Sequence, residues 1–134
     1  MSTRVRHINK SLSQNYLRKS EECLSAASEC LKSRRWNAAV INAVHSGINA
    51  CDALTVFMLG VRHAGDRHED AISLLQTVVL PKDVLSTKSR QLSRLLGVKN
   101  VAEYEERLMN ENDAKEAVRD AERFLSWVKE FLKK

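Results

Sequence analysis

The sequence predicts an all-α fold, a bundle of four main helices plus a short fifth helical piece. Apolar residues recur at three- and four-residue steps through most of the chain, and this spacing is the period of an α-helix. Only four glycines and one proline occur among 134 residues, so the turns that a many-stranded sheet requires are scarce. The length and the 43% hydrophobic content indicate one globular domain over residues 1–134.

The first predicted helix covers about Asn9 to Ser33, and the second covers Trp36 to Leu59. In the first helix, apolar positions follow one face until the basic pair Arg34-Arg35 breaks the pattern. The second helix is apolar on almost every side, which is typical of a central, buried helix. Gly60 is a suitable stop for it, because glycine readily adopts the left-handed conformation at a helix end.

A narrow polar stripe interrupts the second helix. Its members are Asn42, His45, Asn49 and Asp52, which lie within about 80° of one another around the helix axis. Buried polar groups need hydrogen-bond partners, so the stripe is interpreted as a ladder to a neighbouring helix. The alternative is that the stripe borders a cleft or a dimer interface.

The stretch "GVRHAGDRHED" connects the second helix to a third. Asp66 and Glu69 fit a capping box, in which the N-cap residue and the residue three positions later each bond the other's backbone N–H group. The third helix is therefore expected to run from Asp66 to about Val79, and Pro81 is expected to end it.

The remaining helices follow in the second half of the chain. A fourth helix is predicted over about Asp83 to Leu96, with Gly97 as its stop. A short helical piece is predicted over Val101 to Met109. The last helix is predicted over about Asn112 to Leu132, with alanines along its inner face.

Two features indicate affinity for anions. His68 lies in the first turn of the predicted third helix, whose free N–H groups favour an anion, and Arg62 precedes it in the loop. Residues 1–35 carry eight basic against three acidic side chains, and residues 82–99 carry five against one. These segments could attract a phosphate backbone; the alternative is that they are solvated helix faces.

The sequence lacks the motifs of several enzyme and metal-binding classes. It contains no glycine-rich phosphate loop, no HExxH helix and no paired cysteines for zinc. His63 and His68 are five residues apart across a predicted loop, which is poor geometry for binding one metal ion. We therefore expect neither a metal nor a cofactor.

The three cysteines, Cys23, Cys30 and Cys51, form no CxxC pair and are interpreted as small buried hydrophobic residues. Their odd number fits a reduced, cytoplasmic location. The N-terminal residues lack the apolar segment of a secretory signal, and no apolar stretch is long enough to span a membrane.

Two stretches of the sequence resemble the HEPN domain (higher eukaryotes and prokaryotes nucleotide-binding). They are "RRWNAAVINAVHSGINACDALTVFMLGVRHAGDRHEDAISLLQ" and "KNVAEYEERLMNENDAKEAVRDAERFLSWV". The most characteristic parts are A-x-x-x-A-x-H-x-x-I-x-x-x-D-A-L, the A-E-Y before the last helix, and the alanine-rich last helix. The resemblance covers about residues 10–132 and implies an up-and-down bundle of four or five helices.

Many HEPN proteins are metal-independent endoribonucleases with an R-x(4–6)-H motif, and Arg62 and His68 fit this spacing. The resemblance implies that Arg62 holds the scissile phosphate and that His68 acts as general base or acid on the ribose 2′-hydroxyl. It implies that His63 orients the pair. It also implies a homodimer with the motif at the interface, acting on RNA as a toxin or defence effector.

Other HEPN proteins are non-catalytic, and the resemblance implies a nucleotide or an antitoxin-like protein as their partner. The scarcity of aromatic residues for base stacking is compatible with this alternative. The surface would comprise the loop from Arg62 to His68, including Asp66 and Arg67, and also His45, Asn49, Asp52, Lys99 and Tyr104. The simpler interpretation of Tyr104 is a half-buried packing residue, and that of Lys99 is a solvated one.

Overall fold

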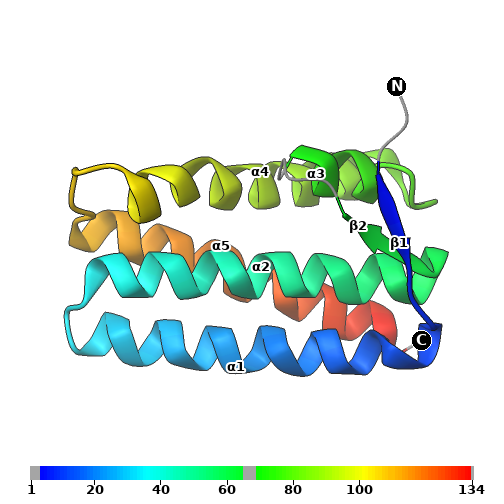
Figure 1. Ribbon diagram of the computed structural model, residues 1–134, viewed down its shortest axis with the longest axis horizontal. Helices are drawn as coiled ribbons and strands as arrows, with labels where there is room; N and C mark the ends of the chain where they lie inside the picture. Colours follow the sequence, from blue (N-terminus) through cyan, green and yellow to red (C-terminus); the bar gives the residue numbers. More distant parts are fainter. Residues whose placement is uncertain (1–3, 65–68, 134) are drawn as a thin grey trace.

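The structure is a computed structural model that describes residues 4–64 and 69–133 (Figure 1). The elements in these ranges are β1 (Val5–His7), the 3₁₀ turn η1 (Lys10–Leu12), α1 (Ser13–Lys32), α2 (Trp36–Leu59), β2 (Val61–His63), α3 (Glu69–Leu75), α4 (Lys82–Tyr104) and α5 (Glu111–Leu132). Four long helices and one short helix confirm the predicted all-α bundle. The two-stranded ribbon of β1 and β2 is an addition to the predicted fold.

α2 is the central helix of the bundle. It packs against α1, α4 and α5, and consecutive long helices run in opposite directions, which is an up-and-down arrangement (Figure 1). Thirteen of the 24 residues of α2 are buried, and these residues are spread around the helix axis. This confirms the central position that its apolar composition predicts. No described helix combines the length and the apolar character that crossing a membrane requires.

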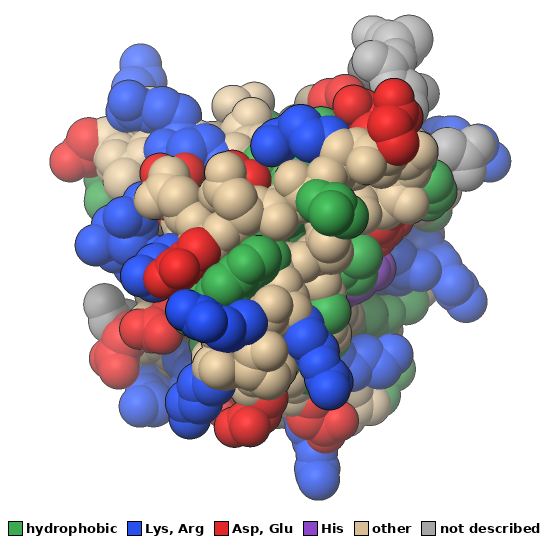
Figure 2. Space-filling model, turned by 90° about the vertical axis from the view of Figure 1, so that its left-hand side faces the viewer, with side chains coloured by type: hydrophobic (Ala, Val, Ile, Leu, Met, Phe, Trp, Pro, Cys, Tyr) green, Lys and Arg blue, Asp and Glu red, His purple; other side chains and the backbone are tan. Residues whose placement is uncertain are grey.

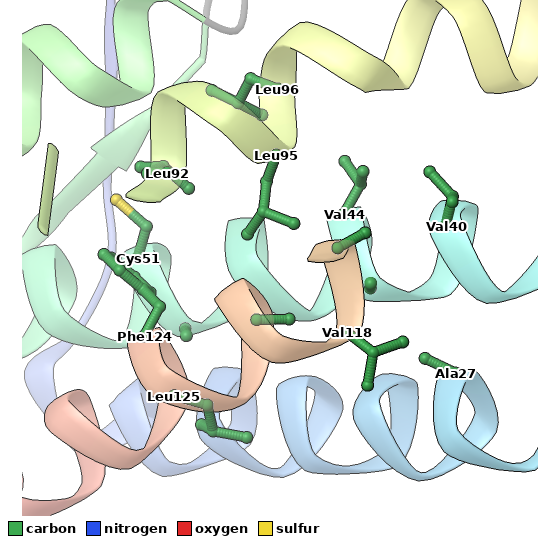
Figure 3. Packing of buried hydrophobic residues seen from close by; sticks show 14 of the residues in the cluster. Ala27, Val40, Val44, Cys51, Leu92, Leu95, Leu96, Val118, Phe124 and Leu125 are labelled. Carbon is green, nitrogen blue, oxygen red and sulfur yellow. The ribbon is translucent and has the colours of Figure 1, made fainter. Parts of the chain in front are cut away.

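The core lies where α2 meets α1, α4 and α5 (Figure 3). It is built largely from alanine, valine and leucine, with Phe124 of α5 as its largest fully buried side chain. Small residues let the helices approach closely, and Gly47 of α2 lies directly beneath Leu95 of α4. On the α1 side, the hydroxyls of Ser20 and Ser46 each donate to the other residue's carbonyl oxygen, at 2.7 and 2.9 Å. These buried hydroxyls are therefore satisfied.

The cysteines are all free thiols, as expected. Cys51 is buried in the core, and this burial, followed by the charge of Asp52, raises the pKa of its thiol. Cys23 and Cys30 are only half-buried on α1, so the prediction that all three are buried is wrong for these two. Both residues lie on α1, which is at the outside of the bundle and packs against fewer helices than α2 does.

α4 continues through Gly97, so the prediction that it ends there is wrong. Gly97 lacks the positive φ of a C-terminal cap, whereas Gly60 has it (φ 72°) and ends α2 as predicted. The helix continues because Val98 and Val101, beyond the glycine, pack against the core. The separate helical piece predicted for residues 101–109 is in fact the last turn of α4 followed by an irregular segment.

α3 ends at Leu75, four residues before the predicted end. The Thr77 hydroxyl and backbone N–H both donate to the Leu74 carbonyl oxygen, which terminates the helix. Val79 is 91% exposed, so no packing favours a longer helix there. Pro81 precedes α4 instead of ending α3. The predicted N-cap Asp66 lies outside the described residues.

The ribbon forms where the chain leaves α2. Gly60 turns the chain, and its carbonyl oxygen accepts a hydrogen bond from Ile8 N–H at 2.9 Å. β1 and β2 are antiparallel, and the pairs are Val5 with His63, Arg6 with Arg62, and His7 with Val61. The N-terminal segment thus lies beside the loop that carries the predicted motif (Figure 1).

Two glycine substitutions test the helix packing. Gly97→Ala places its Cβ in open space within a helix, so we expect it to raise the free energy of unfolding by about 0.5–1 kcal/mol. Gly47→Ala would bring its Cβ within 2.7 Å of Leu95 Cδ1, so we expect a loss of about 1–3 kcal/mol. Urea denaturation of both variants measures the difference. A stabilising Gly47→Ala would contradict the close approach of α2 and α4.

Candidate functional site

The predicted site residues form two clusters along the polar stripe of α2. Asp52 meets β2 near the C-terminal end of the helix, and His45 meets α4 two turns earlier. The step of seven positions from His45 to Asp52 separates the clusters by about 10 Å along the helix axis. Asn49, between them, donates its side-chain N–H to the His45 carbonyl oxygen of the same helix. Of the four stripe residues, His45 and Asp52 contact other elements through their side chains, and neither contact is a hydrogen bond, so the predicted hydrogen-bond ladder to a neighbouring helix is not formed among the described residues.

The first cluster is a buried pair between Asp52 and His63. Asp52 Oδ1 lies 3.4 Å from His63 Nδ1, and the two side chains are 5% and 9% exposed. The contact angle is not that of a hydrogen bond, so it is a close polar contact that leaves Asp52 Oδ1 without a hydrogen-bond donor. Because a buried carboxylate is costly without a partner, this contact holds β2 against α2.

The residue before His63 in the chain, Arg62, is directly opposite Arg6 in the ribbon. Directly opposite residues project on the same face, so the register puts two guanidinium side chains side by side. Arg62 is half-buried; its Nη1 donates to the His63 carbonyl oxygen at 3.2 Å, and its buried Nε has no hydrogen-bond partner among the described residues. Neither arginine has a carboxylate partner in the described ranges, so the pair has capacity to bind an anion.

Arg6 is absent from the residues that the sequence predicts for the site. The tripeptide Val-Arg-His occurs at residues 5–7 and again at residues 61–63. Antiparallel pairing of two identical tripeptides places their central residues opposite each other. The repeat is therefore the one sequence signal for this pairing, although a three-residue repeat is too short to be specific.

The second cluster links α2 to the end of α4 through Glu103. Its Oε1 lies 3.4 Å from His45 Nε2, and its Oε2 lies 3.1 Å from Lys99 Nζ, which is itself 5.4 Å from the centre of the Tyr104 ring. Burial, the largest single influence, favours the neutral acid. Lys99, Tyr104 and His45 outweigh it and hold the pKa of Glu103 below its ordinary value. The cluster is therefore largely satisfied by its own charges.

The structure corrects the simpler interpretations of Lys99 and Tyr104. Lys99 is buried beside Glu103, whereas Tyr104 is 74% exposed. The sequence could have indicated Glu103, because Lys99 and Glu103 have the i, i+4 spacing of a helical ion pair. The predicted stop at Gly97 concealed this spacing.

The remaining observations limit what chemistry the two clusters support. Within the described residues, no group of three or more His, Cys, Asp and Glu side chains is placed to hold a metal ion. The end of the bundle with the α4–α5 connection carries interspersed basic and acidic side chains (Figure 2), so it lacks the single-sign surface that a polyanion favours. Asp66, Arg67 and His68 lie outside the described residues.

Two histidine substitutions compare how much each cluster contributes to the free energy of unfolding. His63→Ala leaves the buried Asp52 carboxylate unpaired, so we expect it to lower the free energy of unfolding by about 3 kcal/mol. His45→Ala is the matched control, because its side chain is 46% exposed and we expect a loss of about 1 kcal/mol or less. Urea denaturation at neutral pH measures both. Equal losses would contradict the structural role assigned to His63.

Comparison with known proteins identifies the family. Residues 13–131 match the HEPN domain family, which confirms the resemblance seen in the sequence. Among solved structures, the crystal structure of TT1696 from Thermus thermophilus has a TM-score of 0.71 at 18% identity, covering 89% of this chain and 97% of that one. No curated protein matches the sequence. Because the family match covers most of the chain, the protein belongs to the HEPN domain family.

Proposed function

We propose that this HEPN protein is a metal-independent endoribonuclease that acts as a homodimer, with Arg62 and His68 as its catalytic residues. The observation that carries the proposal is the incomplete hydrogen bonding of the Arg62 side chain among the described residues. Its buried Nε lacks a hydrogen-bond partner in the part of the chain that the structure describes, and Arg6 lies opposite Arg62 in the ribbon. Like charges placed opposite each other destabilise a strand pair, and a bound phosphate would relieve both the repulsion and the missing bond.

In this proposal the RNA supplies its own nucleophile. The ribose 2′-oxygen forms a bond to phosphorus while the bond from phosphorus to the 5′-oxygen breaks. His68 accepts the proton of the 2′-hydroxyl, the departing 5′-oxygen takes up a proton from water, and a 2′,3′-cyclic phosphate remains. Arg62 donates to the non-bridging phosphate oxygens and stabilises the charge that develops on them. The assignment of His68 rests on the R-x(4–6)-H spacing in the sequence.

Arg6 and His63 have supporting roles in this proposal. Arg6 contributes a second cation from the N-terminal strand, which would improve RNA binding more than the rate of the chemical step. His63 faces the buried Asp52 carboxylate, so we assign it to positioning β2 and its neighbour Arg62. This role is compatible with the orienting role that the family resemblance implies.

A second candidate is a binding module that recognises a nucleotide or an antitoxin-like protein without cleaving RNA. The specific observation in its favour is the burial of His63, which removes one of the motif's polar side chains from contact with a ligand. In this case Arg6 and Arg62 would bind an anionic group without catalysis. The two candidates differ in whether the wild-type protein cleaves RNA.

Cleavage of a mixed RNA pool in the presence of EDTA tests the proposal. We expect the wild-type protein to produce 2′,3′-cyclic phosphate ends, because neither a metal nor an external nucleophile is required. We expect Arg62→Ala and His68→Ala to lower the cleavage rate by about 10²–10³-fold. Arg119→Ala is the matched control, since Arg119 is an exposed arginine on α5 and its loss should leave the rate unchanged.

Two outcomes would contradict the ribonuclease proposal. One is the absence of cleavage by the wild-type protein, which would favour the binding module. The other is undiminished cleavage by Arg62→Ala when the purified variant remains folded by circular dichroism.

A further inference from the structure

A groove between α3 and α4 is distinct from both clusters described above. Its volume is about 650 Å³, within the range of small-molecule sites. Ile72 of α3 and Leu85 of α4 form an apolar part of its lining. Lys82, Ser86, Ser89 and Arg90 of α4 form a polar part, and all four fall on one side of that helix.

Two cations of the basic segment, residues 82–99, line the groove without an acidic partner among the described residues. Arg94 forms a two-bond ion pair with Asp120, at 3.0 and 3.1 Å, and Lys99 pairs with Glu103. Lys88 lies over the Trp127 ring, 5.6 Å from its centre. The other two cations, Lys82 and Arg90, have no acidic partner among the described residues, and no Asp or Glu lines the groove.

Ser89 supplies an independent indication of a ligand. The residue is only 6% exposed, and its hydroxyl has no hydrogen-bond partner within the described ranges. A buried hydroxyl without a partner destabilises the folded state, so a molecule that supplies the missing bond is favoured. One turn earlier, the Ser86 hydroxyl oxygen accepts a bond from Arg90 Nη2 at 3.4 Å, which leaves its own proton available to an acceptor.

We infer that this groove binds a small phosphomonoester with an apolar substituent. A phosphomonoester carries nearly two negative charges at neutral pH, which match Lys82 and Arg90, and its three terminal oxygens can accept bonds from the serine hydroxyls. The apolar substituent would contact Ile72 and Leu85. This inference does not depend on RNA cleavage, because it concerns other residues on other elements.

Isothermal titration with phenyl phosphate tests the inference. We expect saturable binding to the full chain, and weaker binding of inorganic phosphate, which lacks the apolar group. Ser89→Ala and Arg90→Gln should each weaken phenyl phosphate binding by about tenfold, the effect of losing one hydrogen bond or charge contact. Arg119→Gln removes the same charge from α5 and should change the affinity less than about twofold, as expected for a distant exposed charge.

Thermal unfolding of Ser89→Ala provides the folding control. Because the wild-type hydroxyl is unsatisfied, we expect this variant to unfold at the same or a higher temperature than the wild type without ligand. The inference is overturned if the wild type shows no saturable binding of phenyl phosphate. It is also overturned if Ser89→Ala binds as tightly as the wild type, or if Arg119→Gln weakens binding as much as Arg90→Gln.

Discussion

Burial of α2 on all sides is the constraint on which the rest of the structure depends. An apolar helix of 24 residues cannot be covered by one neighbour, so α1, α4 and α5 surround it. Alanines and Gly47 on α2 allow these helices to approach closely, and larger residues on α4 and α5 fill the remaining space (Figure 3). Several polar groups on α2 bond to carbonyl oxygens of the same helix, whereas Asp52 contacts a residue of another element.

Asp52 connects this core to the candidate site. Its carboxylate is buried within the central helix, and His63 on β2 is the side chain it contacts. The pair holds β2 in place, and β2 in turn carries Arg62 and pairs with the N-terminal strand that carries Arg6. Two arginines are thereby held side by side, although repulsion alone would separate them. Stability gained in the core thus supports the arginine pair that we propose as an anion-binding site.

Local sequence patterns predicted the elements that depend on local interactions. α2 and α5 were predicted within one residue of their observed bounds, because their apolar patterns are continuous. Gly60 also marks the C-terminal end of α2. The end of α4 was not predicted correctly, because the packing of Val98 and Val101 against the core overrides the helix-breaking tendency of Gly97. The ribbon, the Arg6–Arg62 pairing and the contact of Glu103 with His45 join residues far apart in the sequence. Periodicity carries no information about such pairings.

Binding of a short single-stranded RNA in EDTA, measured at several salt concentrations, tests the central claim most directly. The account predicts that Arg6→Ala and Arg62→Ala each weaken binding and lower the salt dependence, and that the double variant loses less than the sum of the two. That result would mean that both arginines contact one phosphate group. Unchanged binding in both single variants, with the folded state intact, would contradict the claim that the buried Asp52–His63 pair positions an anion-binding arginine pair.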